Sequence, residues 1–163
     1  MNPVAMAASI WTRAQLTQHE LLWLHDLPLV EQIDSRVTIV HATLKDPSSW
    51  LYILDIIDAC DSMNLQTSKI CFHGHTHQPR SFVSSPQNFT RELEGVEIRL
   101  SAQYKYFINT GSVGQPRDGD PRACYAVFDM DPTPSRRLRY SLGSGEDPGR
   151  RTSRNIGPKA GNR

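Results

Sequence analysis

The chain has 163 residues, 38% of them hydrophobic, with 18 Lys and Arg against 17 Asp and Glu. This length can bury one core but hardly two, and a formal net charge of +1 excludes recognition of a partner through overall charge alone. No apolar run approaches the roughly 18 residues of a membrane span, and the first residues lack the basic start and apolar core of a secretory signal. We therefore expect a cytoplasmic protein with no membrane partner.

The N-terminal residues are predicted to form two helices. Residues 5–15 have a helical composition, and residues 17–20 read Thr-Gln-His-Glu, the pattern of a capping box in front of an apolar segment. The second helix should run to about Asp26, because Pro28 cannot continue the hydrogen-bond ladder. The apolar residues of this region have little sequence nearby to cover them, so we expect an exposed surface that favours self-association or a complementing chain. They include Val4, Trp11, Leu16 and Trp23, together with the strand expected over residues 36–40.

The central part of the sequence alternates strands with one helix. Residues 36–40 are nearly continuously apolar and rich in β-branched side chains, which is typical of a buried strand, and His41 follows at its end. Apolar residues at helical spacing predict a helix from residue 48 or 49 to about 63. A short strand over residues 69–72 then leads into the sequence His-Gly-His-Thr-His, and residues 80–83 form the next strand.

The C-terminal part is predicted to consist of loops and short strands. Residues 84–94 are polar and contain a proline, which favours a loop. Residues 96–100 and 104–108 alternate like two antiparallel strands. A further strand is expected over residues 123–128, and an edge strand over residues 137–142.

We expect one α/β domain over residues 1–142, followed by a disordered tail over residues 143–163. The tail is mainly Gly, Ser, Pro, Arg and Asn without periodicity. Residues 135–163 hold eight Lys and Arg against two Asp and Glu, and such residues can contact nucleic-acid phosphates. The tail offers no aromatic side chain on which bases would stack, so we do not expect a nucleic-acid partner.

The cysteines do not form a recognisable site. Cys60, Cys71 and Cys124 lie far apart in apolar surroundings, with no Cys-x-x-Cys spacing. We therefore expect structural thiols rather than a disulfide framework or a thiolate zinc site.

Three histidines are candidates for metal binding. His75 and His77 are separated by one residue in a tight turn after a predicted strand, and His41 ends another predicted strand. Sites are built where strands end at one edge of an α/β sheet, and imidazole is a common ligand of ions such as Zn, Mn and Fe. Histidines of a loop can also be ordinary surface residues, but Gly74 allows close approach of the backbone here. We predict that the three histidines converge in space.

Several motifs together resemble a known family. Residues 74–77 read Gly-His-Thr-His, residues 109–112 read Asn-Thr-Gly-Ser and residues 114–117 read Gly-Gln-Pro-Arg, in this order after His41. The order resembles the second half of a calcineurin-like metallophosphoesterase, closest to the small bacterial and archaeal phosphodiesterases, over about residues 11–129. The resemblance implies half of a metallophosphoesterase-type β-sandwich flanked by helices.

The resemblance also implies functions for single residues. Members hold two divalent metal ions and hydrolyse phosphate esters, so His41 and His75 are expected to bind one ion of the Mn, Zn, Fe or Ni class and His77 the other. Asn109 would support these ligands by hydrogen bonds from behind. His73 has no clear ligand function in the family pattern; we expect a structural residue, with a hydrogen bond to a neighbouring backbone group or support of the ligands as the alternatives.

A phosphate-ester substrate would need its own contacts in this half of the family domain. Gly111 and Ser112 in the glycine-rich turn, and Arg117 after it, are candidates for contacts with the substrate phosphate. A plain tight turn is the alternative for the glycines. Asp118 and Asp120 are expected to form a solvated turn rather than ligands.

The sequence also departs from the family pattern. Residues 1–40 contain no Asp-x-His and no glycine, so the bridging carboxylate and the catalytic histidine of the family are absent from them. Without such a carboxylate, the repulsion between two dications is not offset. We therefore predict an incomplete phosphatase or phosphodiesterase domain with one metal or none, no catalytic residue of its own, and little or no activity as a single chain. The alternative is a non-enzymatic remnant or a regulatory metal-binding module.

Overall fold

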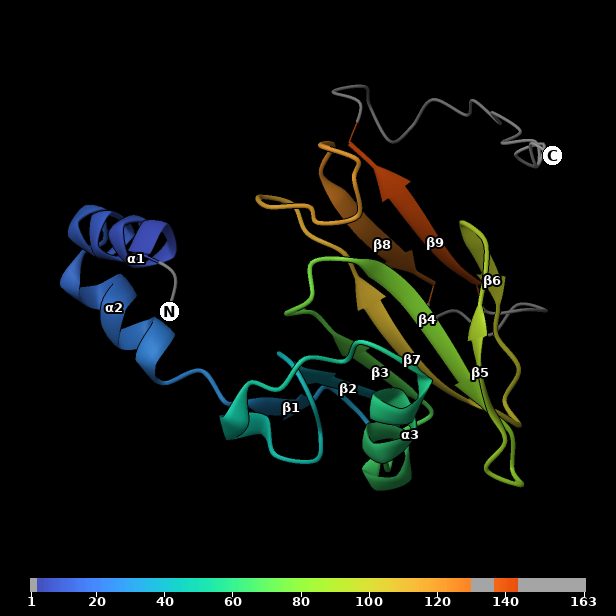
Figure 1. The fold of residues 1–163 in the computed structure, drawn as a ribbon. Coiled ribbons are helices and arrows are strands. Elements are labelled where there is room, and N and C mark those ends of the chain that lie inside the picture. The colour runs from blue at the N-terminus through green and yellow to red at the C-terminus, as the bar shows by residue number, and fades with distance from the viewer. Residues whose placement is uncertain (1–2, 130–136, 144–163) are drawn as a thin grey trace, which may run out of the picture.

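The protein is described here by a computed structural model that covers residues 3–129 and 137–143. Two sheets pack face to face, with helix α3 (Ile56–Leu65) on the outer face of the larger one (Figure 1). The larger sheet has the strand order β1-β2-β3-β7-β4-β5 and the smaller one the order β6-β9-β8. The strands are β1 (Val30–Gln32), β2 (Val37–Val40), β3 (Ile70–His73), β4 (Pro79–Ser84), β5 (Thr90–Leu93), β6 (Glu97–Arg99), β7 (Lys105–Thr110), β8 (Cys124–Phe128) and β9 (Arg137–Leu142). The predicted α/β class is confirmed, whereas the tail from residue 144 on lies outside the described residues.

The three central strands of the larger sheet are parallel. The β2 residue Val37 pairs with Ile70 of β3, which in turn pairs with Tyr106 of β7. Parallel strands end at the same edge of a sheet, and here that edge carries His73 next to Asn109. Strands β1, β4 and β5 join the sheet in antiparallel orientation.

Both faces of the larger sheet are covered over its centre, which explains the nearly continuous apolar sequence of its parallel strands. One face packs on the smaller sheet through a buried cluster that contains Val37, Ile70, Val83, Ile98, Tyr106, Ile108 and Leu138. The other face packs on α3 through a second cluster that contains Val40, Ile53, Ala59, Met63, Cys71, Phe82 and Phe107.

The predicted helix over residues 48–63 is wrong in its first half. Pro47–Ser49 form only a 3-10 turn, and Trp50 has a left-handed backbone with φ of 56°. Helix α3 begins after Asp55, whose carboxylate accepts hydrogen bonds from the backbone N–H groups of Ile57 and Asp58. An aspartate that bonds to the backbone in this way favours a helix start over a helix interior.

Other differences concern strand partners. The predicted loop over residues 84–94 contains β5, which the ion pair between Arg80 and Glu92 ties to β4 with N–O distances of 2.7 Å. Strand β9 lies in the centre of the smaller sheet rather than at its edge. Strands β6 and β7, predicted as an antiparallel pair, belong to different sheets. Strand β1 was not predicted.

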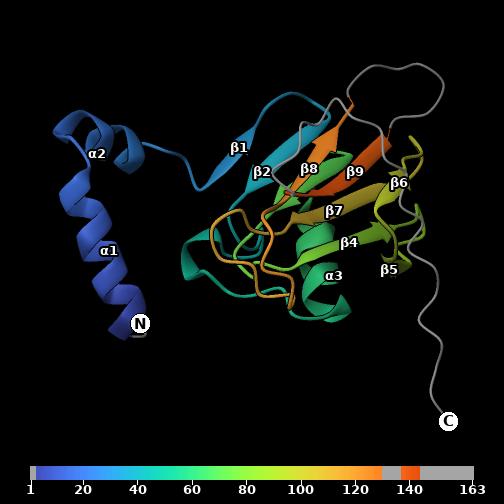
Figure 2. The same cartoon turned by 90° about the horizontal axis from the view of Figure 1, so that it is seen from above.

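The N-terminal helices α1 (Pro3–Gln15) and α2 (Gln18–His25) lie apart from both sheets (Figures 1 and 2). The predicted capping box is confirmed, because the backbone N–H of Glu20 donates to the Thr17 hydroxyl and the Thr17 N–H donates to Glu20. Neither helix buries a residue. The expected apolar exposure of this region is therefore present, but β2 is not an open strand edge, because it pairs with β1 and β3. Among the described residues, no helix combines the length and apolar character that crossing a bilayer requires.

Candidate functional site

The turn after β3 holds two histidines in an unusual backbone conformation. His75 has φ of 67° and His77 has φ of 59°, values that residues other than glycine rarely adopt and that recur at functional sites. The turn is anchored on the end of β2, because the backbone N–H of Gly74 donates to the carbonyl of His41 at 2.9 Å. The same contact brings the His41 and His75 side chains together.

The rings of His41 and His75 face each other through nitrogen atoms. Nε2 of His41 lies 3.1 Å from Nδ1 of His75. Burial is the main cause that lowers the pKa of both rings. The neighbouring histidines make a proton on His41 still less favourable, whereas for His75 a backbone hydrogen bond with Trp50 opposes the lowering, to which His77 and Arg117 add. Both rings are therefore neutral at pH 7, and a neutral imidazole has the lone pair that a metal ion needs.

The ring of His77 is held through its Nδ1 atom. Its Nδ1 lies 2.8 Å from the carbonyl oxygen of Gln115, and because a carbonyl only accepts, Nδ1 carries the proton. Nε2 is then the unprotonated nitrogen, the arrangement found in histidines that bind metals through Nε2.

The described residues fit a partial metal site. Two nitrogen ligands of one ion, each at about 2.0–2.1 Å, lie roughly 3 Å apart, which matches the pair formed by His41 and His75. Within residues 3–129 and 137–143, however, no three His, Cys, Asp or Glu side chains are grouped so that they could hold an ion. The assignment of His41, His75 and His77 as ligands stays a prediction.

Two aromatic residues enclose the histidine pair, and the sequence analysis missed both. The ring of Tyr52 stacks on His75 with centroids 4.2 Å apart, and Trp50 lies 4.7 Å from His41 and 5.9 Å from His75. Both fall within the range predicted as a helix, in which Trp50 is one of the apolar residues at helical spacing. The available signal was Asp55, since a helix capped there leaves Trp50 and Tyr52 outside the helix.

Asn109 fixes the histidine turn from behind, as the resemblance implied. Its side-chain amide donates to the Gly74 carbonyl at 2.8 Å and to the Thr76 hydroxyl at 2.7 Å, and its Oδ1 accepts from the Gly111 N–H at 2.9 Å. Its own carbonyl accepts from the Tyr140 hydroxyl at 2.8 Å. Asn109 and Thr76 are buried, so water could hardly replace these hydrogen bonds if they were lost.

Replacing Asn109 by alanine should therefore lower the free energy of unfolding by about 2–4 kcal/mol, because it leaves buried donors and acceptors unpaired. Urea unfolding measures this change. Asn64→Ala, at an exposed position of α3, is the matched control and should change stability by less than about 0.5 kcal/mol. Equal effects of the two variants would contradict the supporting function of Asn109.

His73 is a buried packing residue, in line with the structural expectation, and among the described residues it makes none of the supporting hydrogen bonds that were the alternative. Its ring stacks on Phe107 with centroids 4.0 Å apart and 9° between the planes. The side chain is buried, and among the described residues neither ring nitrogen has a hydrogen-bond partner. Burial lowers the pKa of His73 to about 3; the Gly74 backbone opposes this effect in part, and the charge of Arg80 adds a smaller lowering. His73 is a neutral packing residue.

The glycine-rich turn is shaped by packing. The N–H of Gly111 is used by Asn109, and a Cβ atom on Gly111 would lie 2.8 Å from the Cβ of Cys124. Ser112 accepts from the Gln115 N–H, and the Arg117 guanidinium donates to the Gln115 side chain at 2.8 Å. The contact of Gly111, Ser112 and Arg117 with a phosphate stays a prediction. The Gly111 N–H would not be a donor in it, because it already bonds to Asn109.

The cysteines and the two aspartates behave as structural residues. Cys71 and Cys124 are buried, Cys60 is half-buried, and all three are free thiols. Burial raises the pKa of Cys71 to about 12, so this thiol is not a nucleophile at neutral pH. Asp118 accepts from the backbone of Asp120, which itself binds Arg122, as in a solvated turn.

Comparison with known proteins places the chain in a family. A model of the calcineurin-like phosphoesterase superfamily domain matches residues 16–133. The uncharacterized protein MJ0912 of Methanocaldococcus jannaschii is 39% identical over 132 residues, which cover 78% of this chain and 51% of that protein. The crystal structure of a metallophosphoesterase from Sphaerobacter thermophilus is similar with a TM-score of 0.68 and 37% identity, and the match covers 86% of this chain and 58% of that one.

The chain thus spans little more than half the length of these two relatives. The family match includes the end of β2, the histidine turn and the glycine-rich turn, the segments that form the candidate site. It agrees with the resemblance seen in the motifs. The chain belongs to the calcineurin-like phosphoesterase superfamily.

Proposed function

We propose that the protein acts in the metal-dependent hydrolysis of phosphate esters, as a phosphatase or phosphodiesterase. The observation that carries this proposal is the pair formed by His41 and His75, with two neutral imidazole nitrogens 3.1 Å apart at the edge where parallel strands end. The family match and the similarity to a metallophosphoesterase support it.

The residues of this chain would contribute binding and orientation. His41 and His75 would hold one divalent ion of the Mn, Zn, Fe or Ni class, and His77 would hold another through Nε2. A bound ion supplies Lewis-acid polarisation of a phosphoryl oxygen. The Arg117 guanidinium, whose charge contributes to the lowered pKa of His75, would bind a phosphate oxygen. The neutral rings need no deprotonation before they bind a metal, since their pKa values are lowered.

The proposal does not give this chain a complete ligand set. Among the described residues no carboxylate joins the histidines, and two ions without a bridging carboxylate repel each other strongly. We propose that the chain alone binds one ion and has weak activity or none, and that a complementing polypeptide would supply the remaining ligands. The proposed location is the cytoplasm.

Metal binding and hydrolysis test the proposal together. The purified chain is incubated with Mn²⁺, Ni²⁺ or Zn²⁺, its bound metal is measured by mass spectrometry of the elements, and hydrolysis of bis(p-nitrophenyl) phosphate and p-nitrophenyl phosphate is followed. His41→Ala and His75→Ala should each weaken metal binding by about tenfold or more and abolish any turnover. His19→Ala, at an exposed position of α2, should change neither.

A regulatory metal-binding module is the second candidate, because the paired histidines are present without a third ligand among the described residues. Stoichiometric metal binding that depends on His41 and His75, with no turnover of either ester, would favour this module. A protein that binds no metal would contradict both candidates and leave a non-enzymatic remnant of the fold.

A further inference from the structure

A second cavity lies far along the larger sheet from the histidines. It has a volume of about 470 Å³ and opens between the two sheets, near the end of β4 and the start of β7. Its floor is apolar, formed by Val83, Leu93 and Ile98 with the ring of Tyr106. Parallel strand β7 places Tyr106 near its start and Asn109 near its end, so the cavity and the histidine turn are separate places in the fold.

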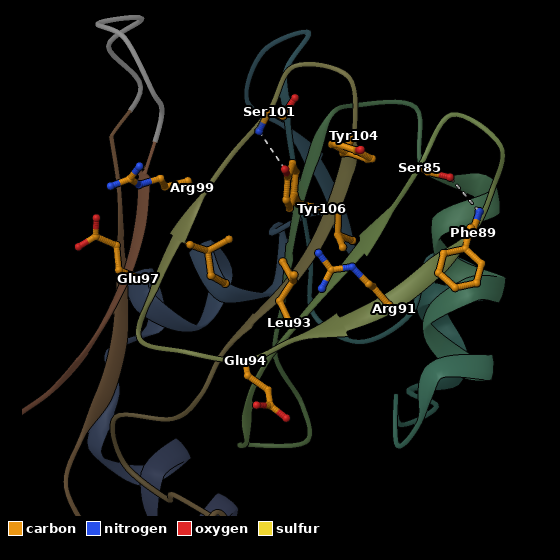
Figure 3. Close-up of a pocket in the computed structure, with 12 residues that line it drawn as sticks. Ser85, Phe89, Arg91, Leu93, Glu94, Glu97, Arg99, Ser101, Tyr104 and Tyr106 are labelled. Carbon is orange, nitrogen blue, oxygen red and sulfur yellow. Dashed lines mark hydrogen bonds between the residues drawn. The ribbon is translucent and has the colours of Figure 1, made fainter. Parts of the chain in front are cut away.

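Arg91 extends into this cavity. In the register of β4 and β5 it lies opposite Val83, so it is on the face that packs against the smaller sheet. Figure 3 shows its guanidinium reaching toward Leu93 and Tyr106. Within the described residues this guanidinium has neither a hydrogen bond nor an ion-pair partner, in contrast to Arg80 on the neighbouring strand, which pairs with Glu92.

A hydroxyl group accompanies the free guanidinium. The Tyr106 oxygen accepts from the Ser101 N–H at 2.8 Å, which leaves its proton without an acceptor among the described residues. Arg91 and Tyr106 line the same cavity. The cavity thus contains a cation and a hydroxyl donor together with an apolar floor.

We propose that this cavity binds a small carboxylate with an apolar body, its carboxylate on Arg91 and Tyr106 and its body on Val83, Leu93 and Ile98. Arginine and a hydroxyl are suited to the two oxygens of a carboxylate, and pockets for small molecules combine an apolar lining with a few convergent polar groups. Glu94 at the rim disfavours a dianion such as phosphate. The proposal is independent of phosphoesterase activity.

A simpler function for Arg91 is protection of the sheet edge. Strand β5 is an edge strand, and charged side chains on such a strand are one means by which proteins prevent pairing of sheet edges. This alternative gives no reason for binding an anion, so ligand binding separates the two.

The probe is benzoate, which has one carboxylate on an apolar ring, and its matched neutral control is benzyl alcohol. Titration of the ¹⁵N-labelled full chain, followed by NMR, should shift the signals of Arg91 and Tyr106 with benzoate and not with benzyl alcohol. Arg91→Gln should weaken benzoate binding by about tenfold or more. Arg99→Gln is the matched control, because Arg99 also borders the cavity but points away from Arg91 (Figure 3), and it should keep the affinity of the wild type.

Tyr106→Phe provides a second variant that keeps the ring and removes only the hydroxyl, and it should weaken benzoate binding several-fold. The melting temperature of each variant is measured to establish that it folds. No benzoate shifts, equal binding of benzyl alcohol, tighter binding of inorganic phosphate than of benzoate, or equal losses in Arg91→Gln and Arg99→Gln would each overturn the proposal. Aggregation of Arg91→Gln with no benzoate binding to the wild type would establish edge protection instead.

Discussion

Replacing His73 by phenylalanine should remove about 2 kcal/mol of the destabilisation that the protein undergoes between pH 8 and pH 5. An unfolded histidine has a pKa near 6.5, whereas burial lowers the pKa of His73 in the folded protein to about 3. Between these two values the unfolded chain binds one more proton than the native chain, so stability decreases as the pH falls from about 6.5. The loss reaches up to about 5 kcal/mol near pH 3.

The measurement is urea unfolding of the wild type and His73→Phe at several pH values. The difference between the two pH slopes is the readout, since any packing cost of the larger ring is the same at every pH. His41 and His75, whose pKa values are also lowered, affect both proteins equally. His19→Phe, at an exposed site, should keep the slope of the wild type. Parallel pH profiles for wild type and His73→Phe would show that His73 does not stay neutral in the folded protein.

Concentration-dependent association is the second large effect that we expect. Helices α1 and α2 bury no residue, and Trp11 and Trp23 are 66% and 60% exposed. Figure 2 shows both helices apart from the sheets, joined to β1 by a single segment. Exposed apolar side chains gathered on two neighbouring helices favour association. The apparent mass in analytical ultracentrifugation should therefore rise with concentration, and a dye that reports apolar surfaces should bind.

The variant Trp11→Gln/Leu22→Gln/Trp23→Gln should remain a monomer over the same range and lose most dye binding. Its melting temperature should stay close to that of the wild type, because these side chains are already exposed. Ile57→Gln, which changes one exposed apolar residue of α3, serves as the control. A wild type that is monomeric at all concentrations, binds no dye and melts cooperatively would falsify the idea that this surface needs a partner.

Much of the central sheet could be predicted because its information is local. Buried parallel strands are continuously apolar, and β2, β3 and β7 lie close to their predicted ranges. Strand β5 was missed because two of its four residues are charged, and the ion pair of Glu92 with the distant Arg80 stabilises it. The position of β9 between β6 and β8 depends on pairing partners far away in sequence, which local patterns do not contain.

The candidate site also contains one contact that could be predicted from the sequence and others that could not. The contact between His41 and His75 follows from two histidines at neighbouring strand ends, a rule that the sequence alone supports. The stacking of Tyr52 on His75 depends on where α3 begins. It could not be predicted because the helical spacing of apolar residues continues on both sides of Asp55. The isolation of both His73 nitrogens results from close packing on Phe107, which no motif signals.

The contact between Gly111 and Cys124 limits how this protein can change its sequence near the candidate site. Gly111 has φ of 78°, and a Cβ there would meet both the Cβ and the Sγ of Cys124 at less than 3.0 Å. A shorter side chain at position 124 would remove only the clash with sulfur, so position 111 stays restricted to glycine whichever residue replaces Cys124. A side chain larger than cysteine would press on the glycine backbone and, through its N–H, on Asn109. Substitutions of Cys124, the first residue of β8, can therefore alter the histidine turn indirectly, although Cys124 belongs to the smaller sheet.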